Sequence, residues 1–178
     1  LVQAKMAYRM LHRSHFRSVV AAHSDDSSVE LFDMTHRFLE EMPFKPPTKT
    51  NRRDEIRTPE GSKYTACTAG APNVGRALSC HWIHLSEYAF YEDPETLYYG
   101  LMQTIGNRPG TGIIIESTAN GVANMFRELW VQAVAGKNDF FPLFVPWWSH
   151  EEYTKPLRLE EEREINDTLE EDERWLVE

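Results

Sequence analysis

The sequence predicts an α/β fold with a mainly parallel sheet that is flanked by helices. Patterns typical of strands and of helices alternate along the chain from its first residues, and this alternation is typical of parallel sheets with helical connections. The run GIIIES at 112–117 is apolar without interruption until its polar end, as expected for a strand that is buried on both faces. Two short runs, RRDEIR and KYTACTA, flank the turn TPEGS and predict an antiparallel hairpin inserted into the sheet.

The other elements follow from residue spacing and from start and stop signals. Apolar residues recur at helical spacing in four segments, 1–13, 29–42, 92–105 and 120–136. The second segment follows the N-cap candidates of SDDSS, the third has its start marked by Asp93, and the fourth ends at Gly136. Short apolar runs at 17–23 and 81–90 predict buried strands, and the proline-rich segment 43–51 predicts a break.

Composition and charge limit the class of protein. A chain of 178 residues suits one domain that buries a sizeable core. The net charge of −9 is uneven, because residues 151–178 hold twelve acidic and four basic residues. The rest of the chain is therefore near neutral, which permits a local basic groove. No apolar run is long enough to span a membrane. Cys67 and Cys80 are too few for a disulfide scaffold and fit a reducing compartment.

Polar residues stand at the ends of three expected strands, at His23-Ser24, Ser86-Glu87 and Glu116-Ser117. Parallel sheets bind ligands beyond the carboxyl ends of their strands. The stretch HWIHLSEYAF reaches Glu87 where its strand should end, and in a nucleotide hydrolase a carboxylate at that place holds Mg²⁺ or orients the attacking water. The simpler alternative is a strand-end glutamate that faces water.

The stretch IIIESTANG forms a second candidate site. Ser117, Thr118 and Asn120 follow an apolar strand and precede a helix. Small hydroxyl and amide groups there could contact a γ-phosphate or its water, since a helix N-terminus favours a nearby anion. The alternative is helix capping, because serine, threonine and asparagine are common N-cap residues.

Three further features have weaker functional interpretations. Arg76, in the loop APNVGRALS, could neutralise charge at a phosphate site, or it could be a solvated surface arginine. His81 and His84 are three residues apart on a strand, so they face opposite sides and do not favour a shared metal ion. The paired tryptophans of FVPWWSHEEY are expected to pack in a core or an interface rather than to stack on bases.

The order of GRALSCHWIHLSEYAF, IIIESTANGVANMFRELW and FFPLFVPWWSHEEY resembles the large terminase subunit of tailed bacteriophages, the ATPase motor that packages viral DNA into a procapsid. The resemblance implies a P-loop NTPase-like sheet of the RecA/ASCE type. It implies that Glu87 is the catalytic glutamate of the Walker B strand and that Ser117, Thr118 and Asn120 form the coupling motif. It implies an arginine finger at Arg76.

Ser86 departs from this pattern, because the family often has an Mg²⁺-associated aspartate there. A serine hydroxyl can still bind Mg²⁺ directly or through water, together with Glu87, but it adds no charge. No Gly-Lys-Ser/Thr phosphate loop occurs in the chain. We therefore expect residues 1–155 to be the C-terminal portion of a motor domain truncated on its N-terminal side. Residues 156–178 are then an acidic helical linker toward a nuclease domain.

The resemblance also implies ligands and partners. They are ATP and Mg²⁺, double-stranded DNA, a portal protein and a small terminase subunit, with a homo-oligomeric ring in the cytoplasm of a bacterial host. The chain by itself is expected to be inactive, because the phosphate loop is not part of it. Two alternatives stay open: a non-catalytic interaction module on the same fold, favoured by Ser86, and another DNA translocase or helicase of the P-loop superfamily.

Overall fold

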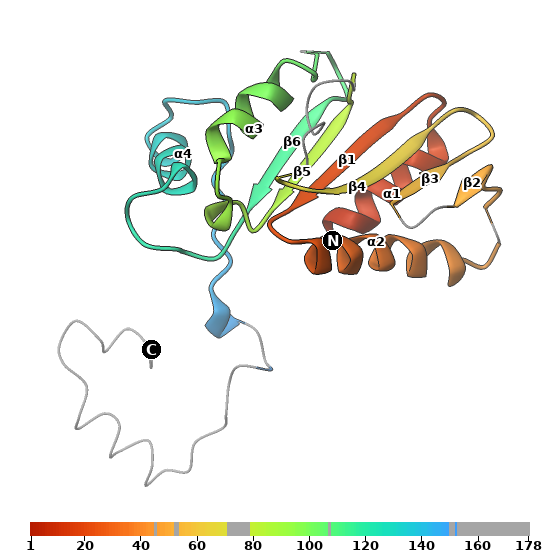
Figure 1. Cartoon of the computed structure of the whole chain (residues 1–178), viewed down its shortest axis with the longest axis horizontal. Helices are drawn as coiled ribbons and strands as arrows, with labels where there is room; N and C mark the ends of the chain where they lie inside the picture. Colours follow the sequence, from red (N-terminus) through yellow and green to blue (C-terminus); the bar gives the residue numbers. More distant parts are fainter. Residues whose placement is uncertain (45, 52–53, 71–78, 107, 150–151, 153–178) are drawn as a thin grey trace, which may run out of the picture. The chain divides into compact units, whose positions relative to one another are not determined.

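The computed structural model describes residues 1–44, 46–51, 54–70, 79–106, 108–149 and 152. The chain divides into two compact units, Leu1–Phe140 and Phe141–Glu178, and Figure 1 shows the elements of the first. In the second unit, the described residues include one short 3₁₀ helix, η2 (Trp147–Ser149). The domain boundary expected after residue 155 lies outside the described residues and stays a prediction.

The first unit is built on a six-stranded sheet with the order β2-β3-β4-β1-β5-β6. Its strands are β1 (Arg17–Ala22), β2 (Thr50–Asn51), β3 (Glu55–Arg57), β4 (Lys63–Thr68), β5 (Trp82–Ser86) and β6 (Gly112–Glu116). Strands β4, β1, β5 and β6 pair in parallel, whereas β3 pairs antiparallel with both β2 and β4. The predicted mainly parallel sheet and the inserted hairpin are therefore confirmed.

Four α-helices accompany the strands in the described residues, and three of them begin at a side-chain cap. They are α1 (Val2–His12), α2 (Asp25–Glu40), α3 (Pro94–Met102) and α4 (Met125–Val134). The side chains of Ser24, Asp93 and Asn124 accept hydrogen bonds from backbone amides in the first turns of α2, α3 and α4. Each cap satisfies an amide that has no partner within its helix.

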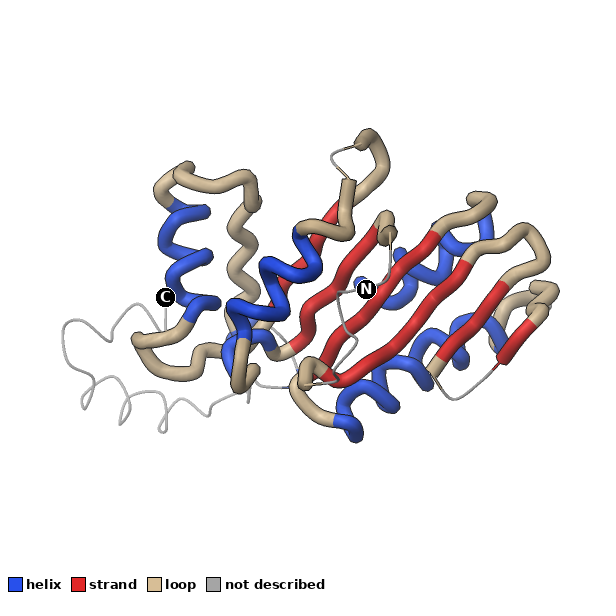
Figure 2. The backbone as a smooth tube through the Cα atoms, turned by 45° about the horizontal axis from the view of Figure 1, so that its top comes forward, coloured by secondary structure: helices blue, strands red, loops and turns tan. Residues whose placement is uncertain are grey.

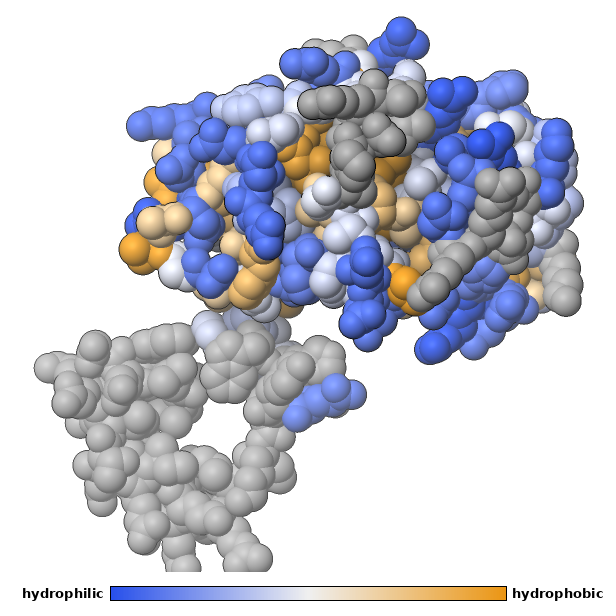
Figure 3. Space-filling view, viewed as in Figure 1, coloured by the Kyte–Doolittle hydropathy of each residue, from blue (hydrophilic) through white to orange (hydrophobic). Residues whose placement is uncertain are grey.

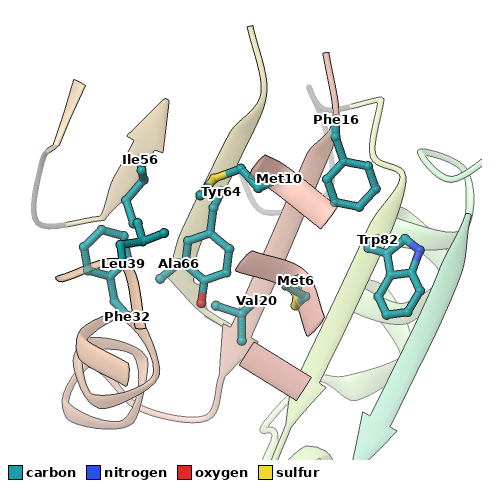
Figure 4. Close-up of a cluster of buried hydrophobic side chains, with 10 residues drawn as sticks. All are labelled: Met6, Met10, Phe16, Val20, Phe32, Leu39, Ile56, Tyr64, Ala66 and Trp82. Atoms are coloured by element: carbon teal, nitrogen blue, oxygen red, sulfur yellow. The ribbon is translucent and has the colours of Figure 1, made fainter. Parts of the chain in front are cut away.

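Helices cover both faces of the sheet, as Figure 2 shows. On one face α1 and α2 contribute Met6, Met10 and Phe32 to a buried cluster (Figure 4). On the other face the side chains of α3 and α4 pack around Ile83 and Leu85 of β5. Side chains along a strand alternate between faces, so the residues of β5 on the α1 face are Trp82, His84 and Ser86. This alternation decides which side chains of β5 can reach the site.

Two features differ from the sequence prediction: the burial of β6 and the start of the last helix. The sequence predicts that β6 is buried on both faces, but all five of its residues are half-buried, because among the described strands β6 is the last of the sheet and pairs with β5 alone. The last helix is predicted from residue 120 and begins at Met125. Residues 117–124 therefore form a loop between β6 and α4 rather than the first turns of the helix.

The face of the first unit that Figure 3 draws is mostly polar. On the face in Figure 3, hydrophilic side chains cover most of this unit, with smaller apolar areas between them. No helix in the described ranges is both long enough and apolar enough to cross a bilayer.

Candidate functional site

The carboxyl ends of β1, β5 and β6 lie side by side in register. Ala22 pairs with Ser86, and Ser86 pairs with Glu116, so the residues that follow these strands meet at one edge of the sheet (Figure 1). A hollow of about 460 Å³ opens there. It is lined by His23, Ser27, Glu30, Leu31, Met34, Ser86, Glu87, Phe90 and Thr118. The structure therefore brings the predicted strand ends together.

Glu87 stands at a sharp change in chain direction. It follows the last residue of β5 and precedes the 3₁₀ helix η1 (Tyr88–Phe90), and its φ of 56° and ψ of 43° are left-handed. A residue with a side chain rarely adopts this conformation unless its surroundings impose it. Here the carbonyl of Glu87 accepts a hydrogen bond from the amide of Phe90. The turn holds the half-buried carboxylate at the hollow.

The loop after β6 contacts this carboxylate directly. The Thr118 hydroxyl donates to Oε2 of Glu87 at 3.2 Å, and the Thr118 amide and the Ser117 hydroxyl approach the same oxygen at 3.4 Å. Three donors converge on one carboxylate oxygen, so they fix the direction of the Glu87 carboxylate.

The same loop is tied to the turn after Glu87. The Ala89 amide donates to the Ser117 hydroxyl at 3.1 Å, and the Asn120 side chain donates to the Ala89 carbonyl at 3.0 Å. The capping alternative for Ser117, Thr118 and Asn120 is wrong, because Asn124 caps α4. Since α4 begins farther along the chain, its N-terminus does not explain an anion site at these three residues.

Ser86 is the last residue of β5, directly before this turn, and is 7% exposed. Its partner across the strands, Glu116, is an acid whose pKa is shifted. Burial alone would raise the pKa of Glu116, but hydrogen bonds from the His84 and Ser86 side chains and from the Glu87 backbone hold that pKa below its ordinary value. Glu116 is therefore ionised at neutral pH beside the predicted site.

A buried polar chain leads away from Glu116 across the sheet. His84 Nε2 lies 3.2 Å from Oε1 of Glu116, and His84 Nδ1 lies 2.9 Å from the amide nitrogen of Gln3. The amide oxygen of Gln3 accepts from the hydroxyls of Tyr64 at 2.8 Å and Thr35 at 3.4 Å. Sequence inspection missed this chain, because its members come from separate helices and strands.

The other candidates have different environments. Nδ1 of His81 accepts from the Arg17 amide, so His81 and His84 use their rings for separate structural contacts. The described residues include no cluster of three or more histidine, cysteine, aspartate or glutamate residues that could hold a metal ion. Arg76 lies outside the described residues. Trp148 is 38% exposed and its ring lies 6.0 Å from that of Phe144, so it is not a core residue of the described structure.

Solved structures with a similar fold include large terminases of bacteriophages. The large terminase of bacteriophage HK97 superposes with a TM-score of 0.62 at 18% identity over 76% of this chain. The large terminase ATPase domain of Thermus phage P74-26 gives 0.55 at 18% identity over 74%, and the large terminase of a thermophilic bacteriophage gives 0.59 at 12% over 76%. The chain has the fold of a phage large terminase ATPase domain.

The chain corresponds to only part of each of these terminase structures. The chain spans 30%, 58% and 34% of those three proteins, respectively. No family model matches the chain, and no curated protein matches it. At this level of identity the terminase likeness establishes the fold, so the roles of individual residues depend on the geometry described above.

The oxygen donors at the carboxyl end of β5 suit Mg²⁺. Ser86 and Glu87 offer oxygen atoms, and Mg²⁺ prefers oxygen ligands, usually one or two carboxylates together with water and substrate phosphates. The assignment of these two residues to Mg²⁺ fits the structure chemically and stays a prediction.

Proposed function

We propose that this chain is part of the ATPase motor of a large terminase and that Glu87 prepares water for attack on the γ-phosphate of ATP. The observation that carries the proposal is the contact between Glu87 and the loop after β6. The carboxylate stands at the end of a parallel strand, borders the hollow, and is held by Thr118 and Ser117. Phosphoryl transfer needs such a positioned carboxylate or amide to orient the nucleophile.

The loop gives Glu87 two properties that this role requires. Hydrogen bonds from Thr118 and Ser117 hold the carboxylate in one direction, as a general base that accepts a proton from water requires. The links from Ser117 and Asn120 to Ala89 join the loop to the turn that carries Glu87. A movement of Glu87 upon hydrolysis would therefore displace the loop, which is how we propose that the coupling motif works.

Mg²⁺ would be held beside Ser86 and Glu87. When bound, it neutralises charge on the β- and γ-phosphates. In the full-length protein we propose that a phosphate loop precedes α1, because the N-terminal turn of α1 lies beside the site: Gln3 contacts His84, which contacts Glu116.

The wider role of the protein follows from the terminase resemblance alone. We propose that the full-length protein translocates double-stranded DNA as a ring. It would work with a portal protein and a small terminase subunit in the bacterial cytoplasm, with a nuclease domain after this chain. A non-catalytic module on the same fold is the main competing proposal. A Gly-Lys-Ser/Thr sequence directly before Leu1 would favour the motor, and its absence from the full-length protein would favour the module.

The proposal is tested by comparing two proteins. The full-length protein should hydrolyse ATP only when Mg²⁺ is present, whereas the isolated 178-residue chain should hydrolyse none and bind ATP weakly. Isothermal titration calorimetry and a phosphate-release assay measure both properties. Micromolar ATP binding by the isolated chain would contradict the proposed division of the site, and a full-length protein that binds no ATP would contradict the ATPase itself.

A further inference from the structure

We infer that Glu116 supplies the negative charge of the Mg²⁺ site that Ser86 does not supply. The inference rests on the proposed function. It adds a residue from a different strand: the charge at this position would come from β6 rather than from β5.

The register of the sheet puts Glu116 at the right level. Ser86 and Glu116 are paired neighbours at the carboxyl ends of β5 and β6. The Ser86 side chain and the Glu87 backbone help to lower the pKa of the Glu116 carboxylate, which places both of them near it. Ser86 also lines the hollow. A carboxylate on the strand paired with Ser86 is therefore available beside the position that an acid on β5 would occupy.

The carboxylate is both oriented and accessible. The side chain of Glu116 is 44% exposed, while that of its partner His84 is 3% exposed. One oxygen of Glu116 is engaged by Nε2 of His84 at 3.2 Å. The side chain therefore remains partly accessible to a cation, while the histidine orients one of its carboxylate oxygens. Carboxylates that ligate metals are commonly held by such second hydrogen bonds.

The buried chain behind His84 determines which way its proton points. The amide oxygen of Gln3 accepts from the hydroxyls of Tyr64 and Thr35, so the amide nitrogen of Gln3 faces His84 and donates to Nδ1. Nδ1 is then an acceptor, and Nε2 carries the proton that is donated to Glu116. With this tautomer His84 orients the carboxylate of Glu116 through a hydrogen bond.

A second negative charge at this edge would strengthen the binding of a cation. Ser86 with Glu87 gives one carboxylate at this edge, and Glu116 gives a second. Mg²⁺ in nucleotide sites is commonly bound by one or two carboxylates together with phosphates. Two carboxylates at the ends of adjacent strands supply what a pair of consecutive acids on one strand would supply.

The test measures metal affinity in the full-length protein, with Mn²⁺ as the probe. Free Mn²⁺ is followed by electron paramagnetic resonance in the presence of a non-hydrolysable ATP analogue. The Glu116→Gln variant should bind Mn²⁺ about tenfold or more weakly, with unchanged affinity for the analogue in EDTA. Adding Ser86→Asp to Glu116→Gln should restore Mn²⁺ affinity, because the charge returns on β5. Glu60→Gln, an exposed change in the β3–β4 turn, should have no effect.

Each outcome decides the inference. Weak Mn²⁺ binding by Glu116→Gln, rescued by Ser86→Asp, supports it. Wild-type Mn²⁺ affinity in Glu116→Gln overturns it, and so does a loss that Ser86→Asp does not rescue, since that loss reflects a structural role for the His84 contact. Melting temperatures of all variants show whether they are folded. If the wild-type protein hydrolyses ATP while Glu116→Gln binds Mn²⁺ normally, only this inference fails; if the wild type binds no nucleotide, the proposed function fails first.

Discussion

The hydroxyl of Thr118 donates a hydrogen bond to the carboxylate of Glu87 across the ends of two parallel strands, at 3.2 Å. The two residues are 31 positions apart in the chain and meet because β5 and β6 pair in register. This contact joins the residue proposed to act on water to the loop proposed to transmit movement. Its consequences can be measured separately from those of nucleotide binding.

Removal of the Thr118 hydroxyl should slow hydrolysis more than it weakens binding. In the full-length protein, Thr118→Val leaves Glu87 with fewer donors, so its carboxylate is less well oriented, and we expect kcat to fall about tenfold or more. KM for ATP should change little. Thr118→Ser keeps the hydroxyl and should retain most activity. Equal losses in Thr118→Ser and Thr118→Val would contradict a role for the hydrogen bond.

Asn120 should stabilise the loop through its bond to the Ala89 carbonyl. Its side-chain nitrogen donates to that carbonyl at 3.0 Å. Asn120→Asp removes the donor at nearly constant volume, so we expect a loss of about 1 kcal/mol in the free energy of unfolding. Urea unfolding of the 178-residue chain measures this loss. Unchanged stability in Asn120→Asp would show that the bond does not hold the loop in solution.

The ion pairs of Glu55 predict a pH-dependent stability. Burial alone would raise the pKa of Glu55, but hydrogen bonds and charges from Arg57 and Lys63 outweigh it and lower that pKa. The stabilisation is therefore present above the unfolded-state pKa of about 4.3 and is lost as the pH falls through the lower folded-state pKa. Glu55→Gln should reduce the free energy of unfolding by up to about 1 kcal/mol at pH 7 and by much less at pH 3.

A matched control isolates this effect. Glu60→Gln removes an exposed acid from the nearby turn and should show no comparable pH dependence. If Glu55→Gln and the wild type differ by the same amount at pH 7 and pH 3, the ion pairs with Arg57 and Lys63 do not contribute to stability.

Cys80 should be unreactive in the folded protein. Burial raises the pKa of its thiol to about 11, and the residue is 3% exposed. Since the thiolate is the reactive form, iodoacetamide at pH 8 should modify Cys80 only after denaturant is added. Mass spectrometry of the modified peptides measures this. Rapid modification under native conditions would contradict the burial of Cys80 in the core.

The parallel core of the fold was predictable because its signals are local. The apolar run of β6 and the cap at Asp93 lie in short segments, and both elements were confirmed near their expected positions. The edge position of β6 was not predictable, since strand order depends on which segments pair. The start of α4 was missed for a similar reason: the asparagine at 120 resembles a cap in sequence, but Asn124 fills that position.

The site was predictable as a set of strand ends but not as a set of contacts. The alternation of elements indicated that Glu87 and Ser117 follow parallel strands, and hence that they meet at one edge. The link from Glu116 through His84 to Gln3 was not predicted. The one available signal was that His84 and Ser86 are two residues apart on a strand and therefore share a face.

The central claim, that Glu87 drives ATP hydrolysis, is tested most directly by steady-state ATPase measurements on the full-length Glu87→Gln variant. The change keeps the size of the side chain and removes its negative charge. We predict that hydrolysis is abolished while ATP still binds with near wild-type affinity, and that the control variant Glu60→Gln hydrolyses ATP normally. Hydrolysis by Glu87→Gln at the wild-type rate would contradict the claim.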